Sequence, residues 1–362
     1  MKNNEQIFVD FHVLQTVPPS CVNRDDTGSP KTAVYGGVTR ARVSSQAWKR
    51  AMRLMFREEF PEEEVGVRTK MIVDMIAKQI SVLNPAAKAE KLAVAVLNAA
   101  GVKVKENKGK QETGALFFIS RRQVEALAAL AAAQSGDKFD KAECQAALKQ
   151  EPAVDIALFG RMVADDPSLN FDAAVQVAHA ISTHAVHNEY DYFTAVDDCA
   201  PEDNAGAGHL GTVEFNSSTM YRYATVNLTE LARGLQGDTV KALRGFADAF
   251  VRSMPTGKQN TFANRTRPDA VYVTIRRDQP VNMAGAFEKP VRAGQDGYVQ
   301  ASEQALVRYA QESYRDYVAA PEVALAVGDA MEPLAAPISL TQLLDTLETW
   351  AAEHLGNSGV AQ

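Results

Sequence analysis

Residues 36–53, GGVTRARVSSQAWKRAMR, constrain the fold more than any other stretch of this 362-residue chain. The paired glycines predict a tight turn, because glycine adopts positive φ at no steric cost. Ser44 and Ser45 stand where a helix should begin, since a serine hydroxyl can accept from the free N–H groups of a first turn. Apolar residues then recur at helical spacing. The stretch therefore predicts a turn, a short basic strand and an amphipathic helix that runs to about Phe56.

Positive charge is concentrated around this helix. Eight basic residues and two acidic ones, Asp25 and Asp26, lie between positions 24 and 57, a local net charge of +6, whereas the whole chain carries −7. The basic residues are Arg24, Lys31, Arg40, Arg42, Lys49, Arg50, Arg53 and Arg57. Localised charge in an acidic protein favours a polyanionic partner, with nucleic acid as the leading candidate. The alternative is that these are solvated surface charges, as charge runs usually are.

The C-terminal part has the opposite charge. From residue 316 to residue 362 there is no Lys or Arg, and seven acidic residues occur. The N-terminus lacks the pattern of a signal peptide, and no apolar run approaches the ~20 residues that a spanning helix needs, so we expect a cytoplasmic protein without membrane contact.

Cofactor and metal motifs are not found in the sequence. Cys21, Cys144 and Cys199 are far apart, which argues against disulfides and a structural zinc site. The three histidines at 179, 184 and 187 have no cysteine or carboxylate at ligand spacing. No Walker motif, dinucleotide fingerprint or nucleophile elbow occurs, so we expect no cofactor and no metal.

Strands and helices both occur along the rest of the chain. Residues 7–14 alternate as a strand with one apolar face, and the turn-rich segment after them, 18–30, is expected to be a loop. Alanine-rich helices follow from about 61 to 171, joined by polar links that include a lysine run at 103–110, interpreted as a mobile loop. Residues 175–182 alternate as a strand, with a helix as the rival interpretation. Residues 191–223 have the composition of a protruding hairpin.

Weaker candidate contacts lie outside the main basic segment. Gly257 to Asn260 form a polar loop that becomes a second basic loop together with Arg265 and Arg267. Lys138 and Lys141 are candidates for a weak nucleic-acid contact. Aromatic residues at the ends of the 191–223 segment, Tyr192, Phe193 and Phe215 among them, favour core packing over base stacking.

Several motifs together resemble the CasC family, the backbone subunits of the type I-E CRISPR surveillance complex, Cascade. They are the segment from HVLQTVPPSCVNRDDTGSP to SSQAWKRAMR, VDIALFGRM, AHAISTHAVHNEYDYFTAVDD, HLGTVEFNSSTMYRYATVNL, PTGKQNTF and NMAGAFEKPV. The resemblance covers nearly the full length. Between residues 61 and 150 it is one of helical character more than of individual residues.

The resemblance implies an α+β fold with a hand-like domain plan. The family combines an RNA-recognition-motif-like (ferredoxin-like) palm, an inserted helical fingers domain and a thumb hairpin. Mapped onto this chain, the palm takes residues 1–60, 172–192 and 223–315, the fingers take 61–171, and the thumb takes 193–222. An acidic C-terminal helical segment, 316–362, completes the chain.

The resemblance also implies roles for individual residues. Guide-RNA contacts are carried over to Arg24, Ser44, Gln46, Lys49, Arg53, Met162, Lys258 and Gln259. The basic segment itself adds Lys31, Arg40, Arg42 and Arg50 as candidate RNA contacts. Tyr192, Phe193, Thr194 and Phe215 belong to the thumb that displaces a guide nucleotide, although the family usually has tryptophan where this chain has Tyr192. Lys138 and Lys141 become candidates for target-DNA contact.

The implied function is positional and not catalytic. The subunit would oligomerise along CRISPR guide RNA in a helical filament with other Cascade subunits. It would present the guide for pairing with target DNA in antiviral defence, and the complex would recruit a helicase-nuclease. The alternative is a metal-dependent RNA endonuclease that uses Asp25 and Asp26, as in type III relatives.

Overall fold

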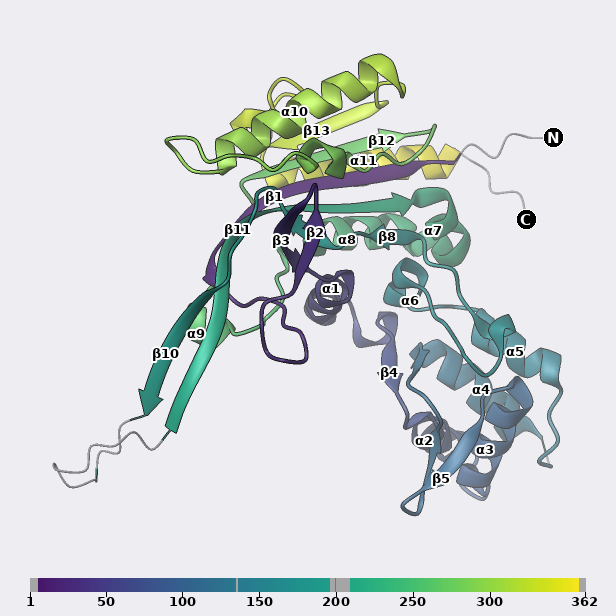
Figure 1. Ribbon diagram of the computed structural model, residues 1–362. Coiled ribbons are helices and arrows are strands. Elements are labelled where there is room, and N and C mark those ends of the chain that lie inside the picture. The colour runs from purple at the N-terminus through teal and green to yellow at the C-terminus, as the bar shows by residue number, and fades with distance from the viewer. Residues whose placement is uncertain (1–5, 135, 196–198, 200–208, 358–362) are drawn as a thin grey trace. The chain divides into compact units, whose positions relative to one another are not determined.

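The computed structural model describes residues 6–134, 136–195, 199 and 209–357 (Figure 1). The chain divides into two compact units. The first, here called the sheet unit, comprises Met1–Met52, Val177–Thr225 and Phe246–His354. The second, here called the helical unit, comprises Arg53–Gln176, Val226–Gly245 and Leu355–Gln362. Runs of strands and runs of helices both occur along the chain, which confirms the mixed α+β class.

A large sheet runs in the order β13-β12-β1-β11-β9-β3-β2, and β8 and β10 also pair with β11. The path strands are β13 (Val323–Val327), β12 (Ala270–Arg276), β1 (Phe8–Ser20), β11 (His209–Asn227), β9 (Ala180–Ser182), β3 (Val38–Val43) and β2 (Thr32–Tyr35). β1 pairs antiparallel with β12, from Phe8 opposite Arg276 to Leu14 opposite Ala270. The first predicted strand is thus a central one.

β1 is buried on both of its faces, because packing layers cover each. On one face Phe11 packs edge-on against Phe246 and Phe250, at ring-centroid distances of 5.5 and 5.9 Å. On the other, Leu14 joins a core cluster with η5 (Met283–Phe287) and α10 (Val299–Asp316). The expectation of a single apolar face was incomplete. The predicted loop from residue 18 also begins too early, because the strand continues to Ser20.

Polar side chains on the second face of β1 form a buried network. The Tyr223 hydroxyl donates to Asp10 Oδ1 over 2.9 Å, and the backbone N–H of Val281 donates to Asp10 Oδ2 over 2.8 Å. His12 Nδ1 lies 2.8 Å from the Tyr221 hydroxyl. Burial raises the pKa of Asp10, and its hydrogen bonds limit the rise. Burial lowers the pKa of His12 to about 3, so this histidine is neutral.

The helical unit has its own core. Its helices are α2 (Ile72–Leu83), α3 (Ala89–Ala100), α4 (Arg121–Ala133), α5 (Lys141–Lys149), α6 (Val154–Phe159) and α7 (Leu228–Leu235). Leucine, isoleucine, valine and alanine side chains of α2 to α5 form one buried cluster. β4 (Val67–Thr69) pairs with β7 (Phe117–Ile119). The lysine run interpreted as a mobile loop is instead a hairpin of β5 (Val104–Asn107) and β6 (Lys110–Thr113).

The described ends of the 191–223 segment pair as the two strands of a hairpin. β10 (Glu189–Ala195) pairs with the start of β11, from Glu189 opposite Phe215 to Ala195 opposite His209 (Figure 1). The Phe193 ring lies over Gly211, where an added Cβ would be 2.4 Å from the ring. Part of the thumb predicted from the family, 196–198 and 200–208, lies outside the described residues. The predicted strand at 175–182 is present as β8 (Val175–Val177) and β9.

The C-terminal part is not only helical. β13 pairs with β12 at one end of the sheet, with Val271 opposite Val327, before α11 (Leu340–Asn357) begins. The acidic residue Glu322, just before β13, accepts a hydrogen bond from Arg277 Nε over 2.7 Å. The expected C-terminal helical segment therefore also contains a strand, because the apolar run that starts at Val323 joins the sheet. No helix among the described residues is both long and apolar enough to cross a membrane.

Candidate nucleic-acid interface

The basic helix is α1 (Ser45–Glu59), and its N-terminus is capped as predicted. Ser44 precedes it, and its Oγ accepts weakly from the Ala47 N–H over 3.4 Å. The Ser44 N–H donates to Asn23 Oδ1 over 2.9 Å. The loop that follows β1 is therefore tied to the N-terminus of the helix. Helix N-termini attract anions through their dipole and free N–H groups.

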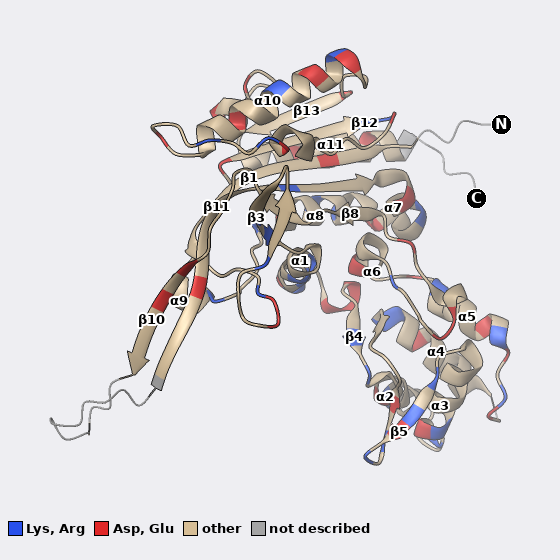
Figure 2. Cartoon of the chain, viewed as in Figure 1, with Lys and Arg blue, Asp and Glu red and all other residues tan. Residues whose placement is uncertain are grey.

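One face of α1 packs and the opposite face is open, as the periodicity predicted. Trp48, Met52 and Phe56 are buried. Gln46, Arg50 and Arg57 are exposed, and Lys49 is partly buried. Figure 2 marks the basic positions of α1 in blue. Arg50 is exposed, and no hydrogen bond or ion pair joins its side chain to another described residue.

The paired glycines form a two-residue turn between β2 and β3. Tyr35 and Val38 are the last paired residues, and Gly36 and Gly37 have φ of 58° and 78°. Positive φ at both central positions is the geometry of a type I′ turn. Gly36 is also sterically required, because an added Cβ would lie 1.7 Å from the Glu288 carbonyl oxygen. The predicted turn is confirmed.

Arg40 is a correction to the predicted RNA contacts. Its side chain is fully buried. The guanidinium donates to the carbonyl oxygens of Tyr35, Ser182, Phe287 and Glu288 over 2.8 to 3.2 Å. A guanidinium that is buried and bonded to four carbonyls cannot also bind a phosphate. Arg40 instead joins the β2–β3 hairpin to the neighbouring segments of the sheet unit.

Arg53, another predicted RNA contact, forms an ion pair inside the protein. Its Nε donates to Asp155 Oδ2 over 2.8 Å, and the side chain of Arg53 is 15% exposed while that of Asp155 is fully buried. The Gly66 N–H donates to the other carboxylate oxygen over 2.7 Å. Burial raises the pKa of Asp155, and the Arg53 charge opposes that rise. Arg53 thus neutralises the buried Asp155 carboxylate within the helical unit.

Arg42, Lys31 and His179 form a small basic group on the sheet unit. Arg42 Nε donates to the Thr32 carbonyl over 2.9 Å, and its Nη1 lies 3.1 Å from His179 Nδ1. Burial lowers the pKa of His179, and the charges of Arg42 and Lys31 lower it further. His179 is therefore a neutral acceptor that positions Arg42, which remains partly exposed.

The loop after β1 is organised by Asp25. Its Oδ1 accepts from the Thr27 hydroxyl over 2.7 Å, the Thr27 N–H over 2.9 Å and the Ser29 N–H over 3.0 Å. The hydrogen bond from the Thr27 side chain is the main cause of the lowered pKa of Asp25. Arg24 and Asp26 beside it are exposed. This carboxylate is used to fold the loop and to present Arg24.

A second loop packs directly on the first. An added Cβ at Gly257 would lie 2.0 Å from the Val22 carbonyl oxygen, so only glycine permits this approach. Lys258 follows with a φ of 50° and precedes α9 (Gln259–Phe262). The charges of Arg24 and Lys258 both act on the buried Cys21 thiol, although burial still raises its pKa. Arg24 and Lys258, 234 positions apart, are thus brought to the same place.

The hairpin base lies beside this basic surface. The Phe215 ring packs against Phe262 of α9 with a centroid distance of 5.7 Å. Farther along β10, Tyr192 and Phe193 are 65% and 41% exposed, and Thr194 is also exposed. Phe215 is therefore a packing residue, as its position predicted, whereas Tyr192 offers an open aromatic face.

Met162 lies in the helical unit on a rigid support. It is 86% exposed, which is unusual for a large apolar side chain. The preceding Arg161 is buried and donates to the carbonyls of Leu169, Phe118 and Leu148, over 2.8 to 3.2 Å. Burial lowers the pKa of Arg161 to about 10. The structure thus holds Met162 out toward solvent.

Two further lysines of the helical unit are exposed. Lys138 lies just before α5, and Lys141 is the first residue of that helix. Lys141 Nζ lies 3.5 Å from Asp166 Oδ2. The exposure of Lys138 is compatible with the weak contact predicted for it. Lys141 is already paired, although a pair at this distance on the surface contributes little.

Sequence reasoning missed Arg222, a buried residue under α1. Its guanidinium carbon lies 3.7 Å from the centre of the Trp48 ring, and its Nη1 donates to Gln15 Oε1 over 2.6 Å. Burial lowers its pKa to about 9. Arg222 supports the packed face of the basic helix. The sequence pattern indicated that Arg222 lies in or beside a strand. It did not indicate that Arg222 packs under the basic helix.

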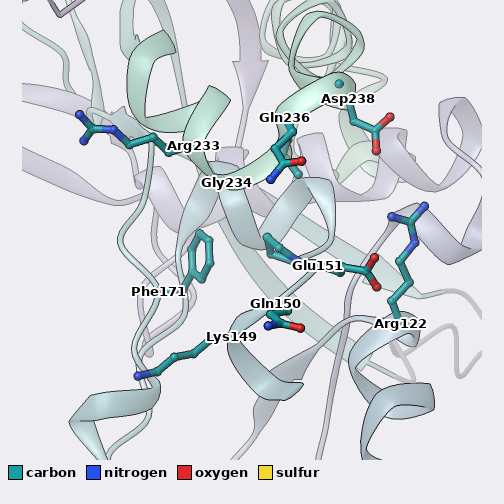
Figure 3. A pocket seen from close by; sticks show the side chains of 12 residues that line it. Arg122, Lys149, Gln150, Glu151, Phe171, Arg233, Gly234, Gln236 and Asp238 are labelled. Atoms are coloured by element: carbon teal, nitrogen blue, oxygen red, sulfur yellow. The ribbon is translucent and has the colours of Figure 1, made fainter. Parts of the chain in front are cut away.

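A cavity of about 620 Å³ lies in the helical unit (Figure 3). Arg122, Lys149 and Arg233 line it together with Glu151 and Asp238, so its charges are of both signs. None of the predicted site residues lies in its wall. No group of three or more His, Cys, Asp or Glu side chains among the described residues is placed to hold a metal ion.

Comparison with known proteins identifies the family. A family model described as "CT1975-like protein" matches residues 9–350. The chain belongs to the CT1975-like family. This match confirms the identification made from the sequence motifs, that the chain is a CasC-type backbone subunit of the type I-E Cascade complex.

Solved structures give the same result. A chain of a structure titled "CRISPR RNA-guided surveillance complex, pre-nicking" is 36% identical, with a TM-score of 0.82, and the match covers 95% of this chain and all of that one. A chain of a "CRISPR RNA-guided surveillance complex" is 31% identical with a TM-score of 0.70, over 95% of this chain and 99% of that one. No match was found among functionally curated proteins.

Proposed function

We propose that this CT1975-like protein binds guide RNA and oligomerises along it, presenting the RNA for pairing with target DNA in antiviral defence. The observation that carries the proposal is the approach of Gly257 to the Val22 carbonyl, which places Lys258 next to the Arg24 loop. The same loop is bonded to Ser44 at the start of α1. Two basic loops and one helix N-terminus therefore converge on the sheet unit.

This surface suits phosphates better than bases. Its charged groups are Arg24, Lys258 and the exposed basic residues of α1, and its helix N-terminus adds N–H donors. Phosphate contacts fix the position of a strand but carry no sequence information. The bases of a guide held in this way stay available, so sequence is read by Watson–Crick pairing with the target.

The two compact units support the hand-like domain plan. We assign the palm to the sheet unit, the fingers to the helical unit and the thumb to the β10–β11 hairpin. The open aromatic face of Tyr192, with Phe193 and Thr194 beside it, supports a role for the thumb in displacing a guide base. The exposed Met162 supports its assignment as a residue that packs beside such a base.

The proposed partners are guide RNA, target DNA, further copies of this chain, other Cascade subunits and a recruited helicase-nuclease. Each copy needs only a modest grip on the RNA. In a filament the neighbouring copies raise the effective concentration of every site, so weak contacts add up to tight binding.

The test is the double variant Arg24→Ala/Lys258→Ala, measured by the amount of guide RNA that co-purifies with the complex. We expect less RNA and a salt dependence of binding reduced by about 1.4 per subunit, since each lost contact to single-stranded RNA contributes about 0.7. The matched control is Arg308→Ala/Lys88→Ala, which also removes one exposed arginine and one exposed lysine, both outside the proposed surface. Unchanged RNA and salt dependence in the first variant would refute the proposed surface.

A further inference from the structure

The lysine run at 103–110 belongs to an ordered hairpin whose role the guide-RNA surface does not explain. β5 and β6 pair from Val104 opposite Thr113 to Asn107 opposite Lys110. Lys108 and Gly109 form the turn with φ of 51° and 77°. Positive φ at both positions indicates a type I′ turn, which is strained for lysine but matches the twist of a hairpin.

The base of this hairpin is fixed to the helical unit. The Thr113 N–H donates to the Lys70 carbonyl over 3.1 Å, and the Val104 N–H donates to Asn98 Oδ1 over 3.3 Å. Thr113 is buried, and Val104 packs against the core cluster of α2 to α5. The hairpin is therefore a supported ribbon, and its free end extends from a rigid base.

Pairing decides which side chains share the open face. Successive residues of a strand point to opposite faces, so Lys105, Asn107, Lys110 and Glu112 lie on the face opposite Val104 and Thr113. Lys105 and Lys110 are diagonal neighbours, about 7 to 8 Å apart. Lys108 adds a third charge at the turn. All three lysines are exposed.

The side chains of these three lysines form no ion pair or hydrogen bond with another described residue, whereas that of Lys103 does. Lys103, at the base of the hairpin, lies 3.7 Å from Asp165. Glu112 is the one acidic residue of the open face, and it accepts a hydrogen bond from Asn107 Nδ2 over 3.2 Å. This face and the turn thus carry three positive charges against one negative charge, while Glu106 is exposed on the opposite face.

We propose that the β5–β6 hairpin binds the phosphodiester backbone of duplex nucleic acid, with Lys105, Lys108 and Lys110 as the phosphate contacts. A two-stranded β-ribbon has the dimensions that the major groove of a duplex admits. Charges on one face and at the tip then reach phosphates at the groove edge. The inference rests on one part of the proposed function, namely that the assembled complex binds target DNA.

The composition of the face favours nucleic acid over an acidic protein. Protein interfaces are depleted in lysine and enriched in aromatic residues and arginine. The open face and turn have lysine and no aromatic residue or arginine. Lysine binds phosphate as a point charge and does not match the paired oxygens of a carboxylate as arginine does. The contact is therefore expected to be independent of sequence.

The experiment uses the full-length chain assembled with its complex and a duplex DNA that lacks any match to the guide. For Lys105→Ala/Lys108→Ala/Lys110→Ala we expect affinity at about 0.1 M salt to fall on the order of tenfold or more. The salt dependence should fall by about 2.7 per engaged hairpin, about 0.9 for each lost phosphate contact. Glu112→Gln should act in the opposite direction and tighten binding about twofold, because it removes the repulsive charge.

The control variant Lys78→Ala/Lys88→Ala/Lys149→Ala removes three exposed lysines of the same unit. An equal loss in this control, or unchanged duplex affinity in the hairpin variant, overturns the proposal. So does a loss confined to single-stranded DNA, or a loss confined to polyglutamate, which would indicate an acidic protein partner.

Guide RNA is quantified in every preparation, so the two proposals fail separately. If the parent complex retains no guide RNA, the proposed function is wrong. If the hairpin variant retains the parent's amount of guide RNA and its duplex binding is unchanged, only the hairpin contact is wrong. Normal guide RNA with weakened duplex binding supports the hairpin contact.

Discussion

Arg53 and Asp155 form an ion pair of 2.8 Å, in which the carboxylate is fully buried and the guanidinium nearly so. The arginine lies on the basic helix, where the charge pattern assigned it to RNA. The pairing changes what a substitution at this position reports. Removal of Arg53 leaves a buried charge without its partner, so any loss of RNA binding would be mixed with a loss of stability.

We predict that Arg53→Ala lowers the free energy of unfolding by about 3 to 5 kcal/mol, the usual cost of breaking a buried pair. Urea denaturation measures this. The exposed neighbours Arg50 and Arg57 serve as controls, and each alanine variant should stay within about 0.5 kcal/mol of the parent. An Arg53→Ala protein as stable as these controls would contradict the buried pair.

The pH dependence of this variant follows from the raised pKa of Asp155. Without Arg53 that pKa rises further above its unfolded value. A carboxyl with a raised folded pKa loses stability as pH rises through that range, and regains it at low pH where it is protonated in both states. The difference between Arg53→Ala and the parent is therefore expected to shrink from neutral to acidic pH.

The two turn glycines provide a matched pair. Gly37→Ala meets no atom within 4 Å and has only the cost of positive φ, about 1 to 2 kcal/mol. Gly36→Ala has the same backbone cost, and its Cβ also falls 1.7 Å from the Glu288 carbonyl oxygen. We expect Gly36→Ala to be the more destabilising by at least about 1 kcal/mol in thermal or urea unfolding. Equal effects would mean that the turn does not pack on Glu288.

His12 predicts a specific acid sensitivity. Its folded pKa of about 3 lies below the ordinary 6.5, so the unfolded chain binds one more proton between these values. Stability should fall as pH drops through this window, by up to about 1.4 kcal/mol per pH unit. His12→Phe should remove this part of the pH dependence, measured by urea unfolding at several pH values. A variant with the parent's slope would show that His12 takes up no proton on unfolding.

The metal-dependent endonuclease is tested at Asp25 and Asp26. The Asp25 carboxylate is committed to Thr27 and Ser29, so we expect no cleavage when the complex is incubated with labelled target RNA or DNA and magnesium. Cleavage that is abolished by Asp26→Ala would contradict this expectation. Because Asp25→Ala is expected to disturb the loop itself, RNA co-purification is measured alongside.

Local patterns in the sequence determined several elements correctly. The Gly36–Gly37 turn and the serine cap need only neighbouring residues, and the apolar spacing of α1 depends on the helix period alone. The family motifs added the family itself, which the match over residues 9–350 confirms. Neither source indicated that the lysine run at 103–110 forms a hairpin, since its strands have few apolar residues to mark them.

Only the tertiary structure decided which basic residues are available. Arg40, Arg53 and Arg222 look like Arg24 and Arg50 in the sequence, yet the first three are bonded inside the protein. Arg53 meets an aspartate 102 positions away, and Arg40 meets carbonyls up to 248 positions away. Helix periodicity predicts the face of the helix on which a side chain lies, but not which residues of the rest of the chain contact that face. Long-range packing brings the acid or carbonyl to the guanidinium, and that contact determines whether its charge remains for RNA.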